Sequence, residues 1–186
     1  QGLAAMQLSV EERQFEQLLA YISLLHKWSK TYNLTAVKDP MELVSLHLLD
    51  SLAILPHLVG DRFIDVGSGA GLPGIPLAIM RPKDHFALLD SNGKKTRFLF
   101  QVRTQLKLTN TTEVNARVEE YTPQSKFDAV LTRAFSDLPT MLQNCHHLTK
   151  ENGLFLAMKG KWPQREIDQM PDGYSLLSTD KLCMPG

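Results

Sequence analysis

This chain has few cysteines and no long apolar run. Cys145 and Cys183 are its only cysteines, too few for a disulfide framework or a cysteine-rich zinc cluster. No apolar run approaches the roughly 20 residues needed to span a bilayer, and no basic stretch followed by an apolar core marks a signal peptide at its start. We therefore expect a cytoplasmic protein with no membrane partner and no metal site.

Net charge is also absent, because 20 Lys and Arg balance 20 Asp and Glu. Hydrophobic residues make up 43% of the 186 positions, as in a folded, single-domain protein. The charge is unevenly spread, however. Residues 81–117 contain eight Lys or Arg and three Asp or Glu. Such a positive region favours a polyanion such as nucleic acid, although a solvated helix face explains half of these cations.

The most informative segment is residues 63–74, FIDVGSGAGLPG. A short apolar strand leads into a glycine-rich turn and then a helix, an arrangement that lets backbone approach a nucleotide. Leu72 occupies the third glycine position of the dinucleotide fingerprint, which disfavours a dehydrogenase. The pattern instead resembles motif I of S-adenosylmethionine-dependent methyltransferases. The cofactor-binding residues expected from this segment are Asp65, Gly67, Ser68, Gly69, Gly71 and Leu72.

Asp90 follows the next predicted strand, residues 85–90. In doubly wound folds an acid about 20 residues beyond the glycine turn accepts hydrogen bonds from ribose hydroxyls. Asp90 fits that position, although a helix N-cap or a loop acid is the simpler alternative.

Apolar periodicity predicts a helical N-terminal section and then alternating strands and helices. Ser9 and Glu12 form a predicted capping box for a helix to about Lys30, and Pro40 begins a second helix towards Leu55. Strands are expected at 62–66, 85–90, 111–115, 127–132 and 153–158, and helices at 74–81, 93–107, 118–121, 137–147 and 163–170. This order predicts a Rossmann-like α/β fold with a doubly wound, mostly parallel sheet.

The expected organisation is one methyltransferase domain, with a helical extension over 1–60 and the Rossmann-like core over 61–186. Residues 174–177 resemble the start of a further strand. A methyltransferase sheet normally ends in an antiparallel hairpin, so the core is expected to lack its last C-terminal strand.

Several longer motifs resemble the bacterial glucose-inhibited division protein B family of 16S ribosomal RNA guanine-N7 methyltransferases. They occur in the family's order and cover nearly the whole chain: 26–40, HLLDSL (47–52), 63–79, 88–99, ARVEE (116–120), LTRAFSDL (131–138) and MKG (158–160). The resemblance implies a class I fold, S-adenosyl-L-methionine as cofactor, and 16S rRNA or the small ribosomal subunit as partner. We expect the protein to be a monomer.

The resemblance also implies cofactor contacts by Gly67, Leu72, Val118, Glu119 and Arg133. Arg133 follows a predicted strand, so it can pair with the methionine carboxylate or an RNA phosphate; an ion pair with Asp137 is the plainer alternative. Glu119 could instead cap a short helix or pair with Arg117. The predicted RNA-binding residues are Lys94, Lys95, Arg97 and Lys159.

No acid–base pair is recognisable, and Arg133 is the one candidate for a catalytic residue. Phe135 could stack on an extruded base, but a core position is favoured. Histidines 26, 47, 146 and 147 are interpreted as structural or surface residues. Guanine N7 carries a free lone pair and needs no general base. The alternatives are a methyltransferase for a small molecule or protein, since fold does not fix substrate, and a non-catalytic RNA-binding assembly factor.

Overall fold

Five parallel strands form the centre of the molecule, in the order β3-β2-β1-β4-β5. The computed structural model describes residues 3, 6–37, 39–133 and 135–181. The strands are β1 (Arg62–Val66), β2 (His85–Leu89), β3 (Thr111–Val114), β4 (Phe127–Arg133) and β5 (Thr149–Met158). Because the strands are parallel, all five carboxyl ends lie at one edge of the sheet. The switch in strand order falls between β1 and β4, where doubly wound folds bind ligands.

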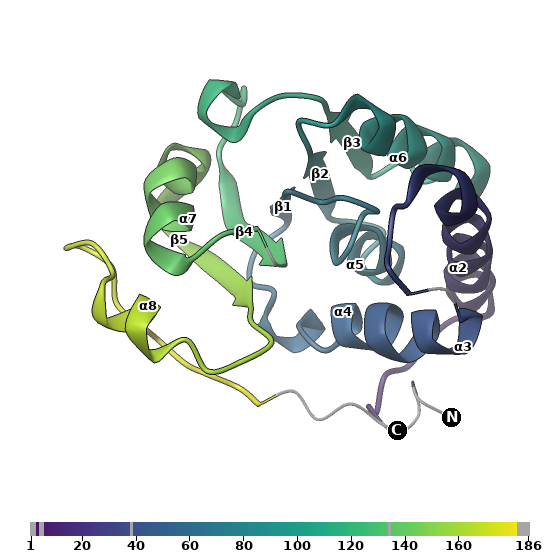
Figure 1. Cartoon of the computed structure of the whole chain (residues 1–186), viewed down its shortest axis with the longest axis horizontal. Helices are drawn as coiled ribbons and strands as arrows, with labels where there is room; N and C mark the ends of the chain where they lie inside the picture. The colour runs from purple at the N-terminus through teal and green to yellow at the C-terminus, as the bar shows by residue number, and fades with distance from the viewer. Residues whose placement is uncertain (1–2, 4–5, 38, 134, 182–186) are drawn as a thin grey trace.

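Helices cover both faces of the sheet, as expected for crossover connections. The core helices are α5 (Gly74–Met80), α6 (Gly93–Leu106), α7 (Leu138–Cys145) and α8 (Gln164–Asp168). Short 3-10 turns are η3 (Val118–Glu120) and η4 (His146–Leu148). Helices α5 and α6 lie on one side of the sheet and α7 on the other (Figure 1).

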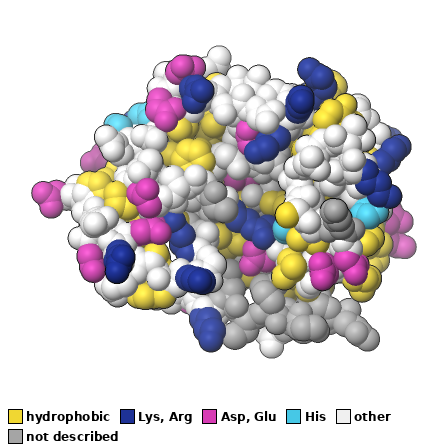
Figure 2. Space-filling model, viewed as in Figure 1, with side chains coloured by type: hydrophobic (Ala, Val, Ile, Leu, Met, Phe, Trp, Pro, Cys, Tyr) yellow, Lys and Arg dark blue, Asp and Glu magenta, His cyan; other side chains and the backbone are white. Residues whose placement is uncertain are grey.

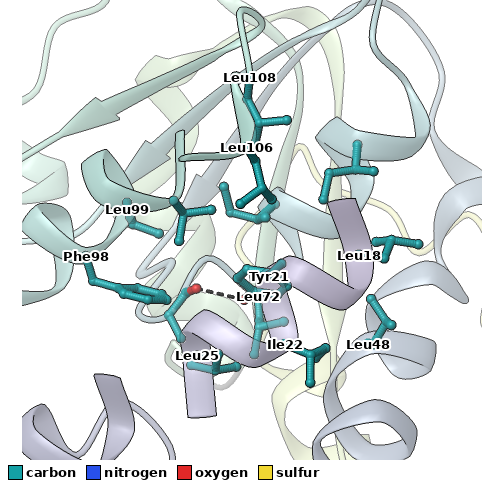
Figure 3. Close-up of a cluster of buried hydrophobic side chains, with 14 of the residues drawn as sticks. Leu18, Tyr21, Ile22, Leu25, Leu48, Leu72, Phe98, Leu99, Leu106 and Leu108 are labelled. Carbon is teal, nitrogen blue, oxygen red and sulfur yellow. Dashed lines mark hydrogen bonds between the residues drawn. The ribbon is translucent and has the colours of Figure 1, made fainter. Parts of the chain in front are cut away.

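The N-terminal helices pack onto the α5–α6 side. They are α2 (Glu12–Tyr32), α3 (Pro40–Leu43), the π-helical turn η1 (Val44–Leu49), α4 (Asp50–Leu52) and the 3-10 turn η2 (Leu55–His57). Figure 3 shows Tyr21 and Leu25 of α2 on the side of Phe98 and Leu99 of α6, and Leu18 of α2 belongs to the same buried cluster. The N-terminal section therefore shares a buried cluster with the sheet layer.

Two details of this section differ from the sequence predictions. Helix α2 begins at Glu12, and its capping box joins Glu11 and Gln14 rather than Ser9 and Glu12. Gln14 has an added reason to lie there, because its Nε2 also donates to the Ile79 and Met80 carbonyls. The second helix is interrupted by the wider π turn η1 instead of running evenly from Pro40 to Leu55.

The second half of the chain follows the predictions closely, with exceptions after β4. Strand β5 starts at Thr149, four residues before the predicted start at 153. Residues 174–177 form no strand, and within the described residues nothing pairs with the outer edge of β5. Cys145 is buried and unpaired, and Cys183 lies outside the described residues. Of the helices described, none has the length and apolar character to cross a bilayer.

Candidate cofactor-binding site

The glycine-rich turn is fixed to the sheet by backbone hydrogen bonds. It leaves β1 at Val66, and the N–H groups of Gly67 and Ser68 both donate to the Leu89 carbonyl at the end of β2, at 2.9 and 3.0 Å. Gly67, Gly69 and Gly71 have φ of +69°, +58° and +89°, a region that glycine enters without steric cost. The turn is therefore held in place before any ligand arrives.

The three glycines of the turn meet different surroundings. A Cβ on Gly71 would lie 2.5 Å from Ile75 Cγ1 and 2.8 Å from Leu99 Cδ2, and one on Gly67 would lie 2.6 Å from the Phe135 ring. A Cβ on Gly69 would meet nothing closer than the Gly67 carbonyl oxygen at 3.8 Å. Packing thus demands glycine at 67 and 71, whereas Gly69 faces open space into which a ligand can fit.

Asp90 joins the turn to the end of β2. Its Oδ2 accepts the Gly69 N–H at 2.9 Å, and its Oδ1 accepts the Asn92 N–H at 2.8 Å. Lys95 Nζ lies 3.6 Å from Oδ2. Each carboxylate oxygen can accept a second hydrogen bond, so Asp90 retains capacity for hydroxyl donors although it is only 5% exposed.

Asp65 is buried beneath the same turn. Its Oδ2 accepts the Gly74 N–H at 2.9 Å, and its Oδ1 has no hydrogen-bond partner. Burial raises the pKa of this carboxyl to about 7; the Gly74 hydrogen bond and the Arg133 charge oppose the shift, and the Asp90 charge adds to it. Asp65 is fully buried, and its hydrogen bond to the Gly74 N–H connects β1 to the start of α5 beneath the turn.

The other predicted cofactor contacts include two apolar side chains. Val118 and Leu72 are buried, Val118 against the α7 face of the sheet and Leu72 in the cluster below α2. Glu119 is exposed, and its Oε1 accepts a hydrogen bond from Asn144 Nδ2 at 3.1 Å rather than pairing with Arg117.

Arg133 ends β4 and contacts the N-terminal helices. Its Nη2 lies 3.2 Å from Asp50 Oδ2 and donates to the Leu46 carbonyl at 2.7 Å. The predicted alternative, an ion pair with Asp137, is wrong because Asp137 caps α7 by accepting the Thr140 N–H. Sequence reasoning missed Asp50, since an acid inside a helical motif resembles any solvated helix residue.

The predicted RNA-binding cations lie in different environments. Lys95 is beside Asp90, as described above, and Lys159 Nζ lies 2.7 Å from both the Ser136 carbonyl oxygen and Glu166 Oε2. Lys94 and Arg97 are exposed on α6 and form no ion pair with any described residue. Elsewhere in the basic region, Arg81 pairs with Asp84 and Arg103 with Glu113.

Figure 2 shows this edge of the sheet as a hollowed face, with Lys or Arg, Asp or Glu, and His side chains gathered near its centre. No cluster of three or more His, Cys, Asp or Glu side chains that could hold a metal ion occurs among the described residues. The unpartnered Ser68 hydroxyl and Asp65 Oδ1, the open side of Gly69 and the spare acceptors of Asp90 fit a polar nucleoside ligand.

The strand order, the glycine turn and the acid after β2 together define a class I S-adenosylmethionine-dependent methyltransferase. Two solved structures share the fold. The S-adenosylmethionine-dependent O-methyltransferase of Thermotoga maritima has a TM-score of 0.53 at 18% identity over 79% of this chain and 56% of that one. A coclaurine N-methyltransferase bound to N-methylheliamine and S-adenosylhomocysteine has a TM-score of 0.50 at 14% identity over 77% of this chain and 50% of that one.

Sequence relatives identify the family. The family described as "GidB: rRNA small subunit methyltransferase G" matches residues 14–186. Ribosomal RNA small subunit methyltransferase G of Vibrio vulnificus is 55% identical over 96% of this chain and 85% of that protein. The same enzyme of Shewanella amazonensis is 52% identical over all of this chain and 90% of its own length. The chain belongs to this family of S-adenosylmethionine-dependent rRNA methyltransferases, which confirms the predicted resemblance, fold class and cofactor.

Proposed function

We propose that this protein methylates guanine N7 in the 16S rRNA of the small ribosomal subunit. The observation that carries the proposal is the edge between β1, β2 and β4, where an open glycine turn, a carboxylate with spare acceptors and a cation meet in a chain of this family. The proposed setting is the cytoplasm, with the protein acting as a monomer and a single domain.

The cofactor's nucleoside is proposed to lie over the turn between β1 and β2. Asp90 accepts the ribose hydroxyls with the lone pairs that Gly69 and Asn92 leave free. Val118 supplies an apolar surface for the adenine, and Arg133 pairs with the methionine carboxylate. The full proposed set comprises Asp65, Gly67, Ser68, Gly69, Gly71, Leu72, Asp90, Val118, Glu119 and Arg133.

Within that set, Asp65 acts from below. Its hydrogen bond to the Gly74 N–H fixes the start of α5, on which the glycine turn rests. Leu72 contributes through the buried cluster that supports the turn.

The chemistry requires alignment rather than a base. S-adenosylmethionine supplies an electrophilic methyl group on a sulfonium sulfur. The guanine N7 lone pair would accept this methyl group, and no proton would have to leave the base. His47, the histidine in contact with Arg133, has both ring nitrogens in hydrogen bonds. Holding N7, methyl and sulfur in line can lower the barrier by several kcal/mol, about 7 in favourable cases.

RNA phosphates are proposed to contact the exposed cations of α6. Lys94 and Arg97 are free to do so, and Lys95 can contribute from beside Asp90. Lys159 already contacts Glu166 and the Ser136 carbonyl, which partly neutralises its charge. We therefore expect it to form part of the surface beside the end of β5 rather than a strong phosphate contact.

The test is methyl transfer from labelled S-adenosylmethionine to 16S rRNA, or to small-subunit particles carrying it, made with either guanine or 7-deazaguanine. Replacing N7 by carbon removes the attacking lone pair and leaves the Watson–Crick edge intact. We expect methyl incorporation into the guanine RNA only. The Asp90→Ala variant measures the background incorporation in the absence of a functional cofactor site. Equal incorporation into the 7-deaza RNA would place the methyl group on another atom.

A further inference from the structure

One nitrogen of Arg133 contacts three polar groups of the N-terminal helical section. Its Nη2 donates to the Leu46 carbonyl at 2.7 Å, approaches His47 Nδ1 at 3.2 Å and lies 3.2 Å from Asp50 Oδ2. The Arg133 and Asp50 side chains are 22% and 27% exposed, so the ion pair is largely shielded from solvent. The π turn η1 contributes two of these groups from neighbouring residues, which a widened helical turn allows.

His47 connects this cluster to the loop at Thr35. His47 Nδ1 lies 3.0 Å from the Leu46 carbonyl oxygen and 3.2 Å from Arg133 Nη2. Its Nε2 lies 2.6 Å from Thr35 Oγ1, which also accepts the Val37 N–H. Burial, with a smaller contribution from the Arg133 charge, lowers the pKa of His47, and the Leu46 carbonyl and the Asp50 charge oppose that shift. The loop at Thr35 and the segment at 46–50 thus converge on the end of β4.

The remaining donors of Arg133 are left for a ligand. Among the residues that the structure describes, every partner of its guanidinium is bound at Nη2, and Nε and Nη1 have none. Strand β4 pairs with β1, with Thr132 opposite Val66, so Arg133 stands beside the start of the glycine turn. Its charge also acts on Asp65 and Tyr21 beneath that turn.

We infer that Asp50 is a positioning residue for the cofactor's amino-acid end. By fixing Nη2, Asp50 directs the other N–H donors of Arg133 towards the methionine carboxylate, which makes the N-terminal helical section part of the cofactor site. This inference rests on the proposed pairing of Arg133 with that carboxylate. The competing possibility is that Asp50 merely neutralises Arg133 and rivals the carboxylate for it.

Two ligands separate these possibilities in calorimetry. S-adenosylhomocysteine carries the amino-acid end, whereas 5′-methylthioadenosine has the same nucleoside without it. In Asp50→Asn, which keeps the shape and removes the charge, we expect S-adenosylhomocysteine affinity to fall about tenfold. Affinity for 5′-methylthioadenosine should stay within about twofold, because its binding groups are untouched. Glu113→Gln, which removes the partner of Arg103, is the matched control and should change neither affinity.

The outcomes are distinct. Equal losses for both ligands would make Asp50 a structural residue, and unchanged or tighter S-adenosylhomocysteine binding would make it a competitor; either result overturns the inference. If Asp50→Asn does not fold, the charge-conserving Asp50→Glu serves instead, with the ratio of the two affinities as the readout. Arg133→Met tests the underlying contact: if it kept the full preference for S-adenosylhomocysteine, the inference would fail, while N7 methylation would still be judged on the 7-deaza RNA.

Discussion

The glycine turn after β1 and the rim beyond β4 and β5 lie at the same edge of the sheet, but they are held in different ways. The turn is fixed by backbone N–H groups, two of them on the Leu89 carbonyl, and by close packing under Gly71. The rim is held by charged side chains, Arg133 with Asp50 and Lys159 with Glu166, each partly exposed.

The difference indicates a division of labour. Backbone hydrogen bonds and packing depend little on salt, so the proposed nucleoside site keeps its geometry under changing conditions. Partly exposed ion pairs contribute less and are screened by ions, so the geometry of the rim should depend more on salt than that of the turn.

The largest effect is expected from a substitution in the closely packed glycine turn. Gly71→Ala adds a Cβ against Ile75 and Leu99 at a φ of +89°. Backbone strain and overpacking together should cost about 3–5 kcal/mol of unfolding free energy. On the rim side, Gly160→Ala meets nothing within 4 Å and should change stability by about 0.5 kcal/mol or less. Denaturant unfolding measures both, and similar losses would show that the turn is no more tightly packed than the rim.

The raised pKa of the buried Asp65 predicts that the stability of the protein depends on pH. Its pKa is about 7 in the folded protein, above its unfolded value near 4. The folded state therefore binds the extra proton between these values, and stability falls as pH rises through that window, by about 2–4 kcal/mol. Asp65→Asn keeps an acceptor for Gly74 and does not titrate. The unfolding free energy of this variant relative to that of the wild type should therefore increase from pH 5 to pH 8. Parallel stability curves would contradict the raised pKa.

Asp90 connects the turn to the ligand. Asp90→Ala removes the acceptors for Gly69, Asn92 and the proposed ribose, so S-adenosylmethionine affinity should fall about 100-fold. Calorimetry on the folded variant measures this. The exposed Asp172→Ala is the control and should bind as the wild type does; undiminished affinity in Asp90→Ala would remove Asp90 from the site.

The smallest effect concerns the cations. Lys94→Ala and Arg97→Ala should each reduce the slope of log affinity for RNA against log salt by about 0.7–0.9, one phosphate contact apiece. Arg103→Ala, whose side chain already pairs with Glu113, should leave the slope unchanged. Slopes equal to the wild type in all three would leave Lys94 and Arg97 as solvated surface.

Much of this architecture was predictable from the sequence because local signals agree with the fold. Strand β1 falls on the predicted residues 62–66, and β2 and α6 end within a residue of prediction. Apolar runs specify buried parallel strands whatever their neighbours. The positions of Asp65, Asp90 and Arg133 at strand ends follow from the same periodicity.

What the sequence could not supply was the choice of partners. Ser9 and Glu12 have the spacing of a capping box, but the tertiary bonds of Gln14 to α5 favour a box with Glu11. Arg133 has Asp137 four residues away, yet its partner Asp50 lies 83 positions earlier in the chain. Helical periodicity gives no sign of the π turn η1, which brings Leu46 and His47 to the nitrogen that Asp50 also contacts.

The buried hydrogen bond from the Tyr21 hydroxyl to the Ala70 carbonyl, 2.8 Å long, links the N-terminal helix to the middle of the glycine turn (Figure 3). Local opening of α2 would leave that carbonyl unpaired and loosen the turn. By thermodynamic linkage, a ligand that binds only the intact turn should in return slow amide hydrogen exchange in α2. Helix α2 thus reports occupancy of a site formed some 50 residues later in the chain.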